Sequence, residues 1–139
     1  MSEYQSVLIK GAKTTVEEKR EKAVLVGVER PGMRWNISSS LAELERLADT
    51  AGADTVAVTT QKLDSPNPRT FVGSGKVEEI SRLCRSTGAD LIIFDDELTP
   101  SQQSNLEKSV DRELESHRSH RFDLRYFRTS RNNQRRTFA

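Results

Sequence analysis

A chain of 139 residues is long enough to bury a single hydrophobic core, so we expect one folded domain. Its 22 Lys and Arg residues nearly balance its 21 Asp and Glu residues, and the overall charge therefore indicates neither a nucleic-acid nor a membrane partner. The sequence holds one cysteine, Cys84, and no run of 18 apolar residues. These features exclude a disulfide-rich secreted domain and a membrane span, and they predict a cytoplasmic chain with a buried, inert thiol.

The charge is unevenly distributed along the chain. Residues 1–110 carry 14 basic and 17 acidic side chains, a net charge of −3, whereas residues 111–139 carry 8 Arg and 4 acidic side chains, a net charge of +4. The second segment has only two aliphatic residues, Leu114 and Leu124, and so cannot build a core of its own. We therefore predict a flexible N-terminal arm (1–22), an α/β domain (23–110) and a disordered or irregular Arg-rich tail (111–139).

The first elements follow from apolar patterns and capping signals. The run 23–28 is continuously apolar, which is typical of a strand covered on both faces. Ser40 and Glu43 have the spacing of a capping box and predict a helix that runs to about Thr50. Gly52 stands where a left-handed residue would end that helix.

An internal repeat organises the middle of the chain. Residues 47–54 align with residues 83–90, and each copy predicts the end of a helix, a glycine cap and a strand, at 55–59 and at 91–94. Alternating helices and strands predict a small parallel or mixed sheet flanked by helices, an α/β fold. The expected core consists of the apolar residues on these elements, namely Val24, Val26, Val28, Leu44, Leu47, Val56, Val58, Ile80, Leu83, Leu91, Ile93 and Leu106.

The stretch 70–80 predicts a strand, a tight turn and a helix start. Gly73 and Gly75 flank a serine, with Gly75 the expected N-cap and Lys76 in the first turn, and exposed amides at such a helix start favour an anion. The spacing does not match a Walker A loop, because Thr70 and Val77 occupy two of its required positions. A structural turn with a solvated lysine remains the alternative. The two prolines of the preceding segment, 61–69, predict an extended exposed loop.

A run of acidic residues follows the second repeat. Asp95, Asp96 and Glu97 stand at the end of a strand and are weak candidates for a Mg²⁺ site, although neighbouring strand residues point to opposite faces and a shared site would need a bend. A solvated turn is the alternative. The segment 99–102 is a second capping box with Pro100 at the first helical position, and the helix that it starts is expected to end at about Val110.

These residues resemble the N-terminal domain of the HflX-type ribosome-associated GTPases over roughly residues 23–110. The resemblance rests on the segments 40–44, 50–53, 71–79 and, above all, 93–108. It implies an α/β subdomain on the large ribosomal subunit, followed by a helical hairpin and a G domain that binds GTP and Mg²⁺. The parent protein would help to split or rescue ribosomes in a GTP-dependent manner. The 139 residues contain no Gly-x-x-x-x-Gly-Lys-[Ser/Thr] motif and no such hairpin, so we expect a fragment that binds no cofactor and hydrolyses no GTP.

Three functions are compatible with these patterns. The first is a ribosome-binding module that contacts phosphates of the large-subunit rRNA, with neither DNA nor a membrane as partner. Its candidate residues surround the loop and the helix start: Lys62, Arg69, Gly73, Ser74, Gly75 and Lys76. The second is a small nucleotide-binding α/β domain that uses the turn 73–76. The third is an RNA-binding module that uses the Arg-rich segment 112–136, in which aromatic residues are interleaved.

The origin of the tail is a separate question. With permitted synonymous codons, the bases that encode residues 116–139 can be read one register over as a Leu/Ile-rich segment. That segment resembles the strand and long helix that follow this domain in the HflX-type family. We therefore expect the tail to be an out-of-frame reading of the family's own continuation, with a genuine basic arm as the alternative.

Overall fold

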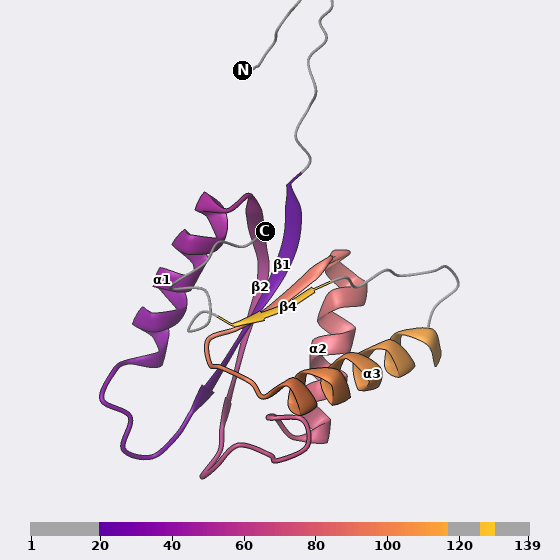
Figure 1. Cartoon of the computed structure of the whole chain (residues 1–139). Helices are drawn as coiled ribbons and strands as arrows, with labels where there is room; N and C mark the ends of the chain where they lie inside the picture. Colours follow the sequence, from indigo (N-terminus) through magenta and orange to yellow (C-terminus); the bar gives the residue numbers. More distant parts are fainter. Residues whose placement is uncertain (1–19, 117–125, 130–139) are drawn as a thin grey trace, which may run out of the picture.

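The computed structural model describes residues 20–116 and 126–129. Along this part the elements are β1 (Glu21–Glu29), α1 (Ile37–Thr50), β2 (Ala53–Lys62), α2 (Ser74–Thr87), β3 (Leu91–Phe94), α3 (Pro100–Ser116) and β4 (Tyr126–Thr129). The strands form one sheet in the order β2-β1-β3-β4, and every neighbouring pair is parallel. The predicted α/β fold with a small parallel sheet is confirmed (Figure 1).

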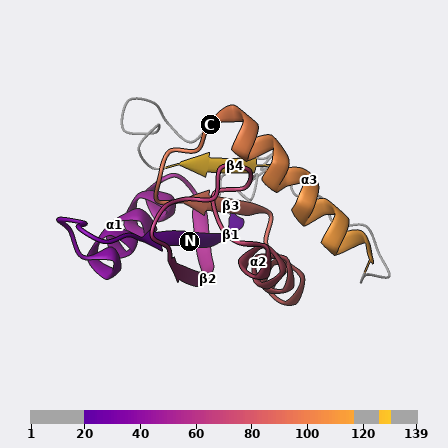
Figure 2. The ribbon, with the colours of Figure 1, turned by 90° about the horizontal axis from the view of Figure 1, so that it is seen from below.

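Helices cover both faces of the sheet, with α1 on one side and α2 and α3 on the other (Figure 2). Successive residues of β1 point to opposite faces: Val24 and Val26 belong to the cluster under α2 and α3, and Leu25 belongs to the cluster under α1. All three are fully buried. Burial on both faces explains why β1 is a continuous apolar run.

Helix α1 approaches the sheet closely at Gly27. A Cβ atom at this position would lie 3.1 Å from a terminal methyl group of Ile37 and 3.1 Å from one of Leu41. A side chain at residue 27 would therefore require the side chains of Ile37 and Leu41 to shift by a few tenths of an ångström.

Two helices begin at residues other than those predicted. Asn36 caps α1, because its side-chain oxygen accepts from the amides of Ser38 and Ser39 at 2.8 and 3.2 Å. Ser40 already lies in the first turn, so the predicted Ser40–Glu43 capping box is wrong. Gly73, not Gly75, is the N-cap of α2, and it offers no side-chain cap.

Most of the predicted core residues are buried, but the predicted burial of Leu47 and Val58 is wrong. Their exposed fractions are 45% and 48%. Leu47 lies at the margin of the buried stripe of α1, and Val58 lies on β2, which is an edge strand of the sheet. Val56 is partly buried. It lies at a register shift between β1 and β2, where Ala23 pairs with residue 55 and Val24 pairs with residue 57.

Helix α3 extends past the predicted end at Val110, to Ser116. Leu106, Val110 and Leu114 follow one another at four-residue intervals and are all buried in the cluster under α2 and α3. Packing of Leu114 therefore continues the helix beyond the break in composition. The predicted arm and tail fall mostly on residues 1–19, 117–125 and 130–139, which lie outside the described residues. No helix in the described part is long and apolar enough to cross a membrane.

Candidate functional site

The carboxyl ends of the parallel strands and the first turns of α1, α2 and α3 lie at the same edge of the sheet. The connection from β1 leads to β2 on one side of β1, whereas the connection from β2 leads to β3 on the other side. Open α/β sheets bind ligands at such a reversal in strand order. The crevice at the carboxyl ends of β1 and β3 is therefore the candidate position for a ligand site.

Internal contacts occupy this edge. The hydroxyl of Ser40 donates to Asp95 Oδ2 at 2.5 Å, and the guanidinium of Arg30 donates to both carboxylate oxygens of Asp96 at 3.0 and 3.3 Å. Asp95 and Asp96 are buried, whereas Glu97 is exposed. Asp95 and Asp96 thus bind separate partners. No group of three or more potential metal ligands occurs among the residues that the structure describes.

The loop 63–73, which connects β2 to α2, is held in a defined shape by its own hydrogen bonds. Asn67 and Phe71 exchange backbone hydrogen bonds of 2.8 and 3.0 Å. The side-chain oxygen of Asn67 accepts from the amides of Arg69 and Thr70 at 2.8 and 3.2 Å. These contacts close a tight turn with exposed Pro68 and Arg69 at its tip.

Two side-chain amides of α3 bind the same loop from outside. Gln102 Nε2 donates to the backbone carbonyl of Asn67 at 3.0 Å, and Asn105 Nδ2 donates to that of Arg69 at 3.0 Å. Gln102 also completes the predicted capping box with Thr99, with reciprocal bonds of 3.0 and 3.1 Å, and this prediction is confirmed. The contacts to the loop were not predicted.

Phe71 anchors the base of the loop. Its φ is +71°, the only positive value for a non-glycine residue in the described part of the chain. Its ring is buried and meets Phe94 edge to face, with 6.0 Å between centroids. A bulky residue adopts this backbone conformation only where its surroundings compensate the strain, and here the aromatic contact and the turn supply that compensation.

The predicted basic residues have different environments. Lys62 and Arg69 are exposed, at the end of β2 and at the tip of the loop. The side chain of Lys76 is only 12% exposed, and its amine donates to Thr59 at 2.9 Å and to Glu79 at 2.8 Å. The hydrogen bond from Lys76 and that from Thr59 lower the pKa of Glu79. The charge of Lys76 is therefore already compensated within the protein.

The start of α2 exposes backbone amides. Gly73 donates its own amide to Gln61 Oε1 at 3.1 Å, and Ser74 and Gly75 are exposed in the uncapped first turn. Further along α2, Cys84 is fully buried, and burial raises the pKa of its thiol to about 12, so it is unreactive at neutral pH.

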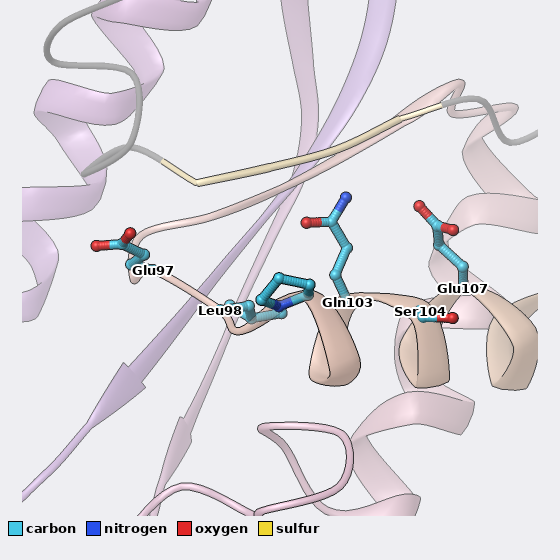
Figure 3. A pocket seen from close by; sticks show the side chains of 6 residues that line it. Glu97, Leu98, Gln103, Ser104 and Glu107 are labelled. Atoms are coloured by element: carbon cyan, nitrogen blue, oxygen red, sulfur yellow. The ribbon is translucent and has the colours of Figure 1, made fainter.

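A separate hollow of about 370 Å³ lies against α3. It is lined by Glu97, Leu98, Pro100, Gln103, Ser104 and Glu107. Figure 3 shows that Gln103 and Glu107 project from α3 on the side away from the loop 63–73. Two carboxylates in its lining make this hollow unsuitable for a phosphate.

A family model described as GTP-binding GTPase N-terminal matches residues 38–117, more than half of the chain. The chain belongs to this family. The matched range of the GTP-binding GTPase N-terminal domain includes the loop 63–73 as well as Gln102 and Asn105.

Several relatives carry the name GTPase HflX. The protein from Flavobacterium psychrophilum is 45% identical over 92 residues, which cover 66% of this chain and 22% of the relative. The protein from Alkalihalophilus pseudofirmus is 44% identical over 86 residues, covering 62% and 20%, and that from Escherichia coli K12 is 41% identical over 68 residues, covering 49% and 16%. The chain thus spans about one fifth of the length of the first relatives.

Proposed function

We propose that this chain is a ribosome-binding module that contacts phosphates of large-subunit rRNA through the loop between β2 and α2. The observation that carries the proposal is a hydrogen-bonded loop that carries exposed Arg69 and follows directly on exposed Lys62, at the carboxyl end of β2. The crevice between β1 and β3 is filled by internal contacts. Membership of the GTP-binding GTPase N-terminal family is consistent with this proposal. The ribosome as partner comes from the resemblance of the sequence to the HflX-type ribosome-associated GTPases.

The chemistry of the loop suits an RNA backbone. Phosphate contacts position a protein on a nucleic acid without reading its sequence, and exposed guanidinium and ammonium groups beside free helix-start amides are the usual donors. We assign the direct charged contacts to Lys62 and Arg69, and amide contacts to the segment 73–75. Lys76 supports the first turn of α2 through Thr59 and Glu79.

We further propose that the chain acts as the N-terminal part of an HflX-type protein in the cytoplasm. GTP-dependent splitting or rescue of ribosomes would then belong to the longer protein, whose G domain would hold GTP and Mg²⁺. The sequence of 139 residues has no phosphate-binding loop of that kind. The amine of Lys76 is engaged by Glu79, which argues against the turn 73–76 as a nucleotide site.

The test is co-sedimentation of the 139-residue chain with purified large subunits over a series of salt concentrations. The double variant Lys62→Glu/Arg69→Glu should weaken binding more than about tenfold and reduce the salt slope by about 2, one for each lost phosphate contact. The matched control is Lys22→Glu/Arg46→Glu, which reverses two exposed charges away from the loop. Equal binding by the two double variants would contradict the proposal.

Equilibrium binding of ATP and GTP to the same chain distinguishes the nucleotide-binding alternative from the ribosome-binding module. Saturable binding that is abolished by a substitution in the segment 73–76 would favour that alternative over the ribosome-binding module.

A further inference from the structure

We propose that Gln102 and Asn105 are positioning residues that hold the loop 63–73 in the shape that binds phosphate. The inference rests on the proposed function, because it concerns how the loop is made ready for RNA. It assigns a role to two side-chain amides of α3 that bind backbone carbonyls of the loop.

The geometry is specific. Residues three apart on a helix lie on one face, and the two side-chain amides reach two carbonyls of one turn, those of Asn67 and Arg69. Gln102 is 8% exposed, so water competes little for its hydrogen bond. Asn105 binds the carbonyl of the residue whose guanidinium we assign to phosphate contact.

The support behind these amides is rigid. Helix α3 packs against α2, and its buried residues Leu106, Val110 and Leu114 join the core cluster on that face of the sheet. The capping box with Thr99 fixes the first turn, from which Gln102 projects. The anchors therefore move little relative to the rest of the domain.

The tip of the loop is supported by its own hydrogen bonds and by these two amides, since its exposed residues have no core contacts. Asp64, Ser65, Pro68 and Arg69 are exposed, and Phe71 holds a strained backbone conformation. Without the two amides, the carbonyls of residues 67 and 69 would bind water and the loop would sample other shapes. RNA binding would then have to order the loop, and affinity would fall.

Two variants remove the hydrogen bonds, and they differ in charge, since Gln102→Glu places a carboxylate at a residue that is only 8% exposed. Asn105→Ala removes one donor and adds no charge, and its control is Ser104→Ala, at the next residue of the same helix. Gln102→Glu keeps an oxygen to accept from Thr99 but has no donor for Asn67. Its control is Ser101→Glu, which adds the same charge at an exposed position in the same turn.

We expect each positioning variant to weaken binding to large subunits about three- to tenfold, with the salt slope unchanged because Lys62 and Arg69 remain. Hydrogen exchange at the amides of Asn67 and Phe71 should accelerate at least about tenfold in the free protein. Exchange in β1 and β3 should stay unchanged, and both controls should bind within about twofold of the natural chain.

The outcomes separate the two proposals. Loss of binding in Lys62→Glu/Arg69→Glu without loss in Asn105→Ala and Gln102→Glu overturns the positioning role and leaves the proposed function intact. Normal binding by Lys62→Glu/Arg69→Glu overturns the proposed site itself. Faster exchange throughout the sheet, with a lower urea midpoint, would show general destabilisation and also overturn the positioning role.

Discussion

Ile93 and Leu47 provide a quantitative test of the fold, because both belong to the predicted core and the structure separates them. Ile93 is 1% exposed on β3, within the cluster under α1, whereas Leu47 is 45% exposed on α1. Ile93→Ala removes buried methyl groups and leaves a cavity, at a cost of about 2 to 5 kcal/mol. Leu47→Ala removes half-exposed groups without a cavity, at a cost of about 1 kcal/mol.

Urea unfolding followed by circular dichroism measures the difference. With a slope of about 2 kcal/mol per molar urea, Ile93→Ala should lower the midpoint by roughly 0.5 to 2 M more than Leu47→Ala does, at an unchanged slope. Equal midpoints for the two variants would refute the assignment of Ile93 to the buried core and of Leu47 to the exposed surface. A changed slope would point instead to an altered unfolded state.

Three further predictions concern the ion pair, the activity and the tail. Hydrogen bonds from Lys76 and Thr59 lower the pKa of Glu79 on folding, so its contribution to stability is present above the unfolded pKa and lost as pH falls through the folded value. The midpoint difference between the natural chain and Glu79→Gln should therefore be present at pH 7 and shrink below about pH 4; an equal difference at pH 7 and pH 3 would show that the charge is not responsible. The 139-residue chain should release no phosphate from GTP above a blank, and turnover in a preparation free of other GTPases would contradict this. For the tail we propose that the gene, read one register over, encodes a Leu/Ile-rich helix followed by a GTPase, and nucleotide sequencing that finds no such frame would favour a genuine basic arm.

Local signals predicted much of the fold. The apolar run of β1, the helix and strand repeat and the capping box at Thr99 each depend on residues close together in the sequence, and the structure confirms them. The exposure of Leu47 and Val58 was not predictable in the same way. Helical periodicity indicates which face of α1 is apolar but not how much of that face is buried. The exposure of Val58 depends on the position of β2 at the edge of the sheet, which is set by strand order.

The candidate site was predicted only in part. The exposed positions of Lys62 and Arg69 follow from a loop that contains two prolines, whereas the contacts of Gln102 and Asn105 join residues 35 and 36 positions apart. No local pattern specifies such contacts. The inward direction of Lys76 had one available signal, the acidic Glu79 three residues later on the same helix face.

The most direct test of the central claim is a crosslink from the loop to RNA. A photoreactive group attached at position 68, exposed at the loop tip, should crosslink to large-subunit rRNA, and addition of Lys62→Glu/Arg69→Glu should abolish the crosslink. The same group at exposed position 46 on α1 serves as the control. Crosslinks to rRNA from position 46 and none from position 68 would contradict the account.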